Sequence, residues 1–377
     1  MPTHPRLFLI LAIGLGLAAA LVISWQWVET SNTQELAVLA LDDNNFQPPI
    51  KKEKSAIKIV KGLYLTAYSA GNPKKIDEII DLINKTELNA VVIDIKDYSG
   101  KILYDSRVPW VIKFKTKENR LGDARALIKK LQEHNIYVIA RQTVFQDPLL
   151  AEKKPEWAIK SQAGGSASSA DRLWHDNKGL TWVDPTRPEV WNYNVAIAKE
   201  AISLGFDEIN FDYVRFPSDG NMSQVVYTNG QEEKYEIMRK FYSFLREQLD
   251  QEPAWISLDM FGYVMERTDD LRIGQRLVDA VDVADYISPM MYPSHYSKNS
   301  LGRENPAEIP GLIIANGMQK GLPSFKDQRA KVRPWLQAFD IGAMYSDGPK
   351  IREQIEAVEK YDNAGWLLWN AANRYSA

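Results

Sequence analysis

The 377-residue chain contains no cysteine, which excludes a disulfide scaffold, a thiol nucleophile and a cysteine-based zinc site. It has only 4 histidines and neither a His-x-His nor an H-E-x-x-H motif, so we expect no catalytic metal. A net charge of −3 leaves no basic excess of the kind that nucleic-acid binding needs. No G-x-G-x-x-G follows the first predicted strand and no G-x-S-x-G is present, so a dinucleotide cofactor and an α/β-hydrolase esterase are unsupported. The sequence therefore predicts a protein without a cofactor.

One long apolar run lies at the N-terminus. Arg6 precedes the apolar residues 7–23, and Trp25 and Trp27 follow before the first acidic residue, Glu29. This length and these flanks predict a membrane anchor over residues 1–28, with the rest of the chain exported. A cleaved signal peptide is the alternative, because the small residues 18–20 offer a cleavage site. Residues 29–57 are then a polar linker, and residues 58–377 form the exported domain.

Within that domain, short apolar runs alternate with amphipathic helical stretches. The helical stretches include residues 74–86, 122–134, 188–205, 231–249 and 351–361, each with an apolar face. Alternating strands and helices predict parallel strands, and eight of them fit a (β/α)8 TIM barrel. The expected strands are Gly62–Thr66, Ala90–Ile95, Tyr137–Gln142, Glu208–Tyr213, Trp255–Met260, Tyr286–Tyr292, Val332–Ala338 and Trp366–Trp369. The chain ends soon after the eighth strand, so either the linker covers that part of the barrel or the strand count is off by one.

In such a barrel, the functional side chains lie at the C-terminal ends of the strands and point toward the axis. Because strand residues alternate in direction, Asp94, Lys96, Asn210, Asp212 and Asp259 should face inward. Paired carboxylates are what glycoside hydrolysis uses: one protonates the leaving oxygen, and the other attacks or activates water. Crowding also separates their pKa values, which suits one acid and one base. The alternative is that these charged residues form a structural ion-pair network inside the barrel.

Other polar and aromatic residues near the same strand ends are candidates for substrate binding. Arg215 could hold a hydroxyl or an acidic sugar, or pin its loop through a salt bridge. Trp335 and Trp369 could stack on sugar rings, although packing in the barrel core explains tryptophans equally well. The predicted catalytic residues are Asp94, Asp212 and Asp259, and the predicted substrate-binding residues are Tyr64, Lys96, Arg141, Asn210, Arg215, Tyr292, Trp335, Gln337 and Trp369.

Several sequence blocks resemble those of a known bacterial family, described as a "putative glycosyl hydrolase domain". The resemblance covers about residues 60–375, and the blocks over residues 210–217 and 333–337 are the specific ones. The blocks are Lys61–Thr66, Val92–Asp97, Phe206–Pro217, Pro289–Pro293 and Arg333–Gln337.

The resemblance implies a barrel distantly related to α-amylase-like hydrolases, which carry an Asp nucleophile on strand four and a Glu acid on strand five. Asp212 matches the first position, and the shorter Asp259 stands at the second. The strand-seven His-Asp pair of those enzymes is absent here, which weakens an expectation of α-glucan substrates.

Two functions are therefore expected from the sequence. The first is a retaining or inverting glycosidase that acts on an envelope or extracellular polysaccharide. The second is a non-catalytic glycan-binding barrel tethered to the membrane. The absence of a glutamate at the acid position on strand five favours this second function.

Overall fold

The computed structural model describes residues 53–56, 58–162 and 172–376. The predicted anchor over residues 1–28 and most of the predicted linker lie outside the described residues. Among the helices that are described, none is long and apolar enough to cross a membrane.

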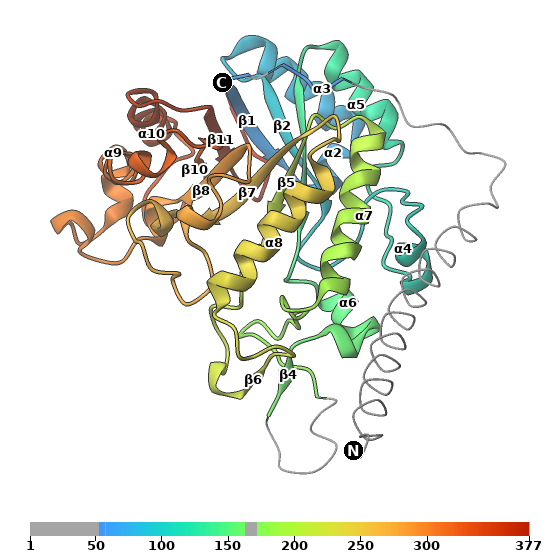
Figure 1. Cartoon of the computed structure of the whole chain (residues 1–377). Coiled ribbons are helices and arrows are strands. Elements are labelled where there is room, and N and C mark those ends of the chain that lie inside the picture. Colours follow the sequence, from blue (N-terminus) through green and yellow to red (C-terminus); the bar gives the residue numbers. More distant parts are fainter. Residues whose placement is uncertain (1–52, 57, 163–171, 377) are drawn as a thin grey trace, which may run out of the picture. The chain divides into compact units, whose positions relative to one another are not determined.

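The centre of the domain is a closed barrel of eight parallel strand positions (Figure 1). Each strand pairs with its neighbour, and β8 pairs with β10 to close the ring. This confirms the predicted strand order and the expected TIM barrel. The strands are β1 (Val60–Leu65), β2 (Ala90–Lys96), β3 (Tyr137–Thr143), β5 (Glu208–Asp212), β7 (Trp255–Phe261), β8 (Tyr286–Met291), β9 (Lys331–Val332) with β10 (Trp335–Gln337), and β11 (Gly365–Trp369).

Two strands differ from the sequence prediction. The seventh was expected to run from Val332 to Ala338 without a break, but it is divided into β9 and β10 at Pro334, which has no N–H to donate to the ladder. The fourth was expected to include Tyr213, but β5 ends at Asp212 because Tyr213 has a positive φ of 53°.

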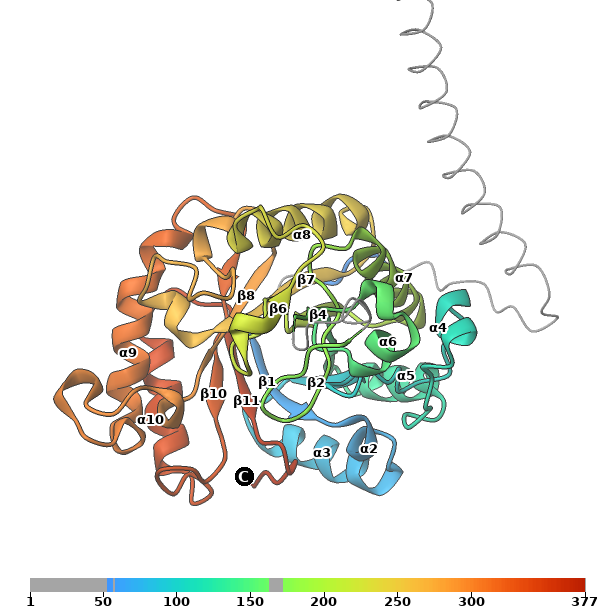
Figure 2. The same cartoon turned by 90° about the horizontal axis from the view of Figure 1, so that it is seen from below.

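Helices surround the barrel, as the view along its axis shows (Figure 2). Their apolar faces pack against Leu63, Val91, Ile93, Ile209 and other outward strand residues in one large core. The helices are α2 (Ala67–Ala70), α3 (Pro73–Lys85), α4 (Pro109–Phe114), α5 (Ala124–Glu133), α6 (Pro148–Lys153), α7 (Pro188–Leu204), α8 (Lys234–Leu249), α9 (Pro310–Gly321) and α10 (Pro349–Glu359).

The inward side chains form a separate, smaller cluster. Val60, Tyr64, Val92, Ile139 and Trp335 belong to it, and none of them belongs to the outer core. The period-2 alternation that the sequence suggested is therefore present in the barrel.

The described segments before β1 and after β11 contact opposite ends of the barrel. Asn373 and Tyr375 both donate side-chain hydrogen bonds to the backbone oxygen of Tyr64, at 3.1 and 2.9 Å. At the other end of the barrel, Trp255 Nε1 donates to the backbone oxygen of Ser55 at 2.9 Å. The strand count of eight was correct, and the final segment of the chain holds the end of β1 without a helix.

Two loops at the C-terminal ends of the strands are joined to each other. The segment after β3 contains β4 (Lys160–Ser161), which pairs with β6 (Val225–Val226) in the segment after β5. Trp174 and Trp182 from the first loop are buried, with 2% of their surface exposed. The described parts of the two loops therefore form a wall beside the end of β5, which carries Asp212.

Candidate active site

A cavity of about 400 Å³ opens at the C-terminal ends of the strands. Two of the predicted catalytic residues, Asp212 and Asp259, line it together with the predicted binding residues Arg141, Arg215 and Tyr292. Its remaining lining comes from the ends of β5, β7, β8 and β11. These residues are Tyr213, Phe261, Gly262, Tyr263, Met290, His295, Tyr296 and Trp369.

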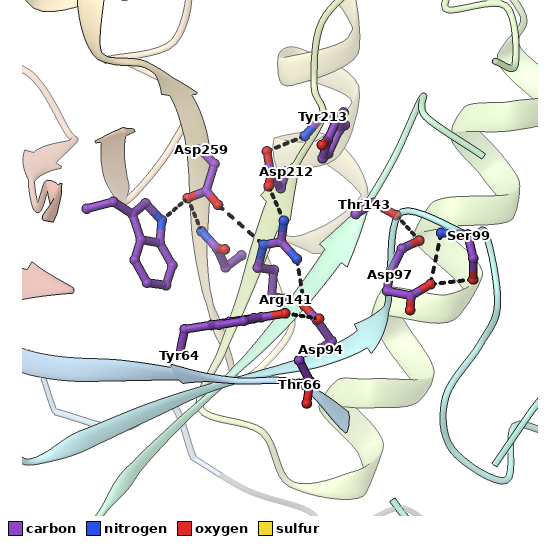
Figure 3. Close-up of polar contacts among 12 residues, drawn as sticks. Tyr64, Thr66, Asp94, Asp97, Ser99, Arg141, Thr143, Asp212, Tyr213 and Asp259 are labelled. Carbon is purple, nitrogen blue, oxygen red and sulfur yellow. Dashed lines mark hydrogen bonds and ion pairs between the residues drawn. The ribbon is translucent and has the colours of Figure 1, made fainter. Parts of the chain in front are cut away.

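Arg141 is the centre of the polar network beneath the cavity (Figure 3). Its Nη1 donates to Asp94 Oδ1 at 2.6 Å, and its Nη2 donates to Asp212 Oδ2. Its Nε lies 3.8 Å from Asp259 Oδ2. One guanidinium from β3 therefore faces three carboxylates from β2, β5 and β7, which is the planar, forked recognition that arginine provides.

Asp94 lies at the bottom of this network and is only 3% exposed. Besides the bond from Arg141, it accepts a 2.5 Å hydrogen bond from the Tyr64 hydroxyl. Burial raises the pKa of Asp94, while Arg141 and Tyr64 oppose that rise. The cavity lining does not include Asp94, so its place fits orientation of Arg141 better than direct contact with a substrate.

Asp212 is the last residue of β5, and the chain turns away immediately after it. The backbone N–H of Tyr213 donates to Asp212 Oδ1 at 2.5 Å. The other oxygen, Oδ2, accepts the charged hydrogen bond from Arg141. Both oxygens of this side chain are therefore held in place by a donor, one of them a cation.

Asp259 has different surroundings. Its Oδ1 accepts hydrogen bonds from Asn210 Nδ2 and from Trp335 Nε1, both at 2.8 Å. It is 1% exposed. Burial, followed by the nearby charge of Asp212, raises the pKa of Asp259 well above its ordinary range. Asp259 is therefore suited to carry a proton, whereas Asp212 is paired directly with the Arg141 guanidinium.

An aromatic platform adjoins the carboxylates. The Trp369 ring stacks on Tyr64 with centroids 3.9 Å apart, and the Arg141 guanidinium lies 5.0 Å from the Trp369 centroid. Tyr292 and His295 also line the cavity, with their ring centroids 5.3 Å apart. Burial lowers the pKa of His295, so its neutral form is favoured.

Three sequence predictions need correction at this site. Lys96 was expected to face the axis, but it points outward, pairs with Asp147 at 2.7 Å and donates to Asn194 of α7 at 3.0 Å. An irregularity in the β2–β3 register between Asp94 and Lys96 reverses the alternation there.

The other two corrections concern residues that are buried as supports. Trp335 is fully buried and binds Asp259, so it has no free face for a sugar. Gln337 is also fully buried: it accepts from Ser294 N and donates to the backbone oxygens of Phe339 and Ile341, which connects the loops after β8 and β10.

Several lining residues were not predicted from the sequence. Tyr213, Phe261, Gly262, Tyr263 and Tyr296 line the cavity. Each lies at the end of a strand or in the loop that follows one, which is a signal the sequence offers, but alternation gives no direction to side chains beyond the strand. Across residues 53–56, 58–162 and 172–376, no group of three or more His, Asp or Glu side chains is placed to hold a metal ion.

Comparisons with known proteins agree with this architecture. The glycoside hydrolase domain of PgaB (BpsB) from Bordetella bronchiseptica is similar in fold at 12% identity, with a TM-score of 0.57, over 82% of this chain and 94% of that one. A hypothetical protein from Ruminiclostridium thermocellum ATCC 27405 is 41% identical over 52% of this chain and 96% of that one, with a TM-score of 0.47. No curated protein is significantly similar. Residues 62–375 match the family described as "Putative glycosyl hydrolase domain", so the chain belongs to that family, as its sequence blocks and its barrel indicated.

Proposed function

We propose that this protein hydrolyses glycosidic bonds of a polysaccharide, with Asp259 as general acid and Asp212 as nucleophile. The observation that carries the proposal is the contrast between two carboxyl groups that line one cavity. Asp212 is paired with Arg141, whereas Asp259 is buried and its pKa is raised. The reaction needs one carboxyl group that donates a proton and a second that attacks the anomeric carbon. Membership of a glycosyl hydrolase family supports the same reaction class.

Asp212 and Asp259 come from neighbouring strands. In the β5–β7 register Phe211 pairs with Leu258, so the two residues are the next neighbours across the two strands. We propose the retaining course of the reaction, in which the second carboxyl group is the nucleophile and the two groups lie roughly 5–5.5 Å apart.

The proposed reaction has two steps. In the first, Asp212 Oδ2 or Oδ1 attacks the anomeric carbon, the glycosidic C–O bond breaks, and the leaving oxygen takes the proton of Asp259. In the second, the Asp259 carboxylate removes a proton from water, the water oxygen bonds to the anomeric carbon, and the ester bond to Asp212 breaks. Asn210 and Trp335 hold Asp259 Oδ1, which leaves Oδ2 to carry the transferred proton.

Substrate binding is assigned to the aromatic platform and its polar neighbours. Trp369 lies beside the carboxylates and is supported from behind by Tyr64, so its ring can pack against the C–H face of a sugar. Tyr292 lines the same cavity. Burial raises the pKa of the Tyr292 hydroxyl, and the nearby Asp259 raises it further. These groups give a sugar ring one flat apolar contact and several polar ones.

A non-catalytic glycan-binding barrel is the second candidate. The observation that favours it is the low exposure of both carboxyl groups, 5% for Asp212 and 1% for Asp259. In that case the network would only shape a binding surface. Glycan binding without turnover under every condition would select this second function.

We also propose that the barrel meets its substrate outside the cytoplasm. The apolar run over residues 7–23 supports a barrel held outside the cytoplasm, where envelope or extracellular polysaccharides are found. Fractionation of cells that express the full chain, followed by protease treatment of intact cells or spheroplasts, tests this. Barrel fragments that stay protected until lysis would contradict an exported domain.

The catalytic assignment is tested with aryl glycosides and natural glycans on the wild type, Asp212→Asn and Asp259→Asn. Both variants should lose at least about 100-fold in kcat on natural glycans, since general acid catalysis alone contributes roughly 10²–10⁴-fold. With a dinitrophenyl leaving group, which needs no protonation, Asp259→Asn should recover most of its first-step rate and Asp212→Asn should not.

Asp279→Asn is a matched control because Asp279 is a buried carboxyl group that pairs with Arg276 and does not line the cavity. It should keep wild-type kinetics. Equal activity of wild type and Asp212→Asn on every substrate would refute the assignment.

A further inference from the structure

Arg215 is the second cationic residue of the cavity, and its surroundings differ from those of Arg141. It lies three residues after Asp212, in the wall that the loops after β3 and β5 form, and it lines the cavity. Its Nη1 donates to the backbone oxygen of Phe216 at 3.0 Å and to Ser218 Oγ at 3.4 Å. Both partners are neutral oxygens, so these bonds position the guanidinium without supplying a counter-ion.

Aromatic rings complete its surroundings. The guanidinium carbon lies 5.0 Å from the centroid of Trp182, 5.1 Å from Tyr213 and 4.8 Å from Phe261. Rings from three segments therefore pack around the cation, which is 9% exposed and faces the cavity. Low-polarity surroundings of this kind strengthen any charged interaction that Arg215 makes.

Buried arginines elsewhere in the described domain are paired with acids. Arg141 contacts Asp94 and Asp212, and Arg333 is paired with Glu208. Arg215 is 9% exposed, yet no carboxylate of a described residue lies within ion-pair distance of it. The sequence left two roles open for Arg215: binding of a sugar group, or a salt bridge that pins its loop. The described residues show no such salt bridge.

An unpaired buried cation is costly. Burial lowers the pKa of Arg215, although nearby Tyr213, Asp212 and Asp219 oppose that effect through space. Such a cost is offset when the cation binds an anionic ligand, and the arginine fork fits the planar geometry of a carboxylate.

We propose that Arg215 binds an anionic group on the glycan, so that the preferred substrate carries an acidic sugar, such as a uronic acid, next to the cleaved bond. This inference rests on the proposed function, because it takes the cavity as the glycan site. It narrows the substrate class from polysaccharides in general to acidic ones.

The test uses pairs of substrates that differ only in charge. Oligomers of glucuronic, galacturonic and mannuronic acid are compared with the same oligomers after chemical reduction of their carboxylates to alcohols. For the wild type, kcat/KM should be roughly 10- to 100-fold higher on the acidic member of the preferred pair, as expected for a charged hydrogen bond in a dry site. In Arg215→Met, which keeps an apolar stem against the rings, this ratio should fall toward one.

Two further variants separate binding from structural effects. Arg215→Lys keeps the charge but loses the fork, so its ratio should lie between those of wild type and Arg215→Met. Arg276→Met is the control, because Arg276 also stacks on an aromatic ring, Tyr235, at 3.6 Å but does not line the cavity. Its ratio should equal that of the wild type.

A wild-type ratio near one, or a preference that persists in Arg215→Met, would overturn the inference even if hydrolysis is observed. If no substrate is hydrolysed, calorimetric titration of the same pairs into the full chain still decides. Tighter binding of acidic oligomers that depends on Arg215 supports the inference while the proposed hydrolysis fails, and equal binding of both members overturns it. A third arm with sulfated neutral oligomers shows whether the bound anion is a carboxylate or a sulfate.

Discussion

Replacement of Asp259 by asparagine is expected to stabilise the folded protein at neutral pH. A carboxyl group that is buried and carries a raised pKa is expensive to ionise in the folded state, whereas asparagine is never ionised. Asparagine has nearly the same shape, and its Oδ1 can accept the same hydrogen bonds from Asn210 and Trp335. Its Nδ2 takes the place of the protonated oxygen.

The sign and the size of this stability difference follow from the linkage between protonation and folding. The folded pKa of Asp259 lies above its unfolded value of about 3.8, so the folded chain binds more protons over that interval. The stability that Asp259 contributes is therefore complete below pH 3.8 and is lost as the pH rises toward the folded pKa. The loss is about 1.4 kcal/mol for each pH unit in that window, and it becomes constant above the folded pKa.

The measurement is urea unfolding of wild type and Asp259→Asn from pH 4 to pH 8. The difference in unfolding free energy should be small near pH 4 and should grow in favour of the variant as the pH rises. Asp250 provides a control of opposite sign, because Arg246 lowers its pKa. Asp250→Asn should therefore be the less stable form by a constant amount from pH 4 to pH 8, and its deficit should shrink only when the pH falls below about 3.8.

A flat difference from pH 4 to 8, with Asp259→Asn the less stable form, would refute the reasoning. It would mean that Asp259 is ionised in the folded protein, and an ionised Asp259 cannot be the general acid. The same titration thus tests the catalytic assignment without any substrate.

Three further substitutions have defined outcomes. Tyr64→Phe removes the 2.5 Å hydrogen bond to Asp94 and should lower the unfolding free energy by about 1–3 kcal/mol in urea titrations, with an unchanged value counting against the network. Lys96→Met leaves Asp147 buried without its partner and should cost about 3–5 kcal/mol, of which the double variant with Asp147→Asn should recover part in the same assay. Gly262→Ala places a Cβ 2.6 Å from a backbone oxygen of β8. It should lower the unfolding free energy by about 1–3 kcal/mol, which is measured as a lower Tm. An unchanged Tm would show that the strand end can move.

The fold could be predicted because its signals are local and repeat along the chain. Outward residues such as Ile93 and Phe211 form apolar runs with period 2, and they alternate with helical stretches, which together leave few topologies. The packing of the segment after β11 could not be predicted in the same way. Its contacts join Asn373 and Tyr375 to β1, more than 300 residues away, and no local pattern encodes them.

The site was predictable where strands are regular. Alternation placed Asp94, Asp212 and Asp259 on the axis, and the structure brings all three to one arginine. It could not show which of them reaches the cavity, because depth along the axis depends on the stagger between strands.

The error at Lys96 shows where this reasoning fails. A single irregularity in register between Asp94 and Lys96 turns the Lys96 side chain outward. A buried lysine there needs a partner, and Asp147, at the start of α6, supplies one. Lys96 and Arg141 looked equivalent in the sequence, since both are cations near the ends of adjacent strands. Of these two cations only Arg141 lies on the axis, so one guanidinium contacts the three carboxylates and Lys96 does not. With one cation shared among three acids, at least one carboxyl group is favoured to be protonated, and the most deeply buried of the three, Asp259, is the one that the proposed mechanism uses as its acid.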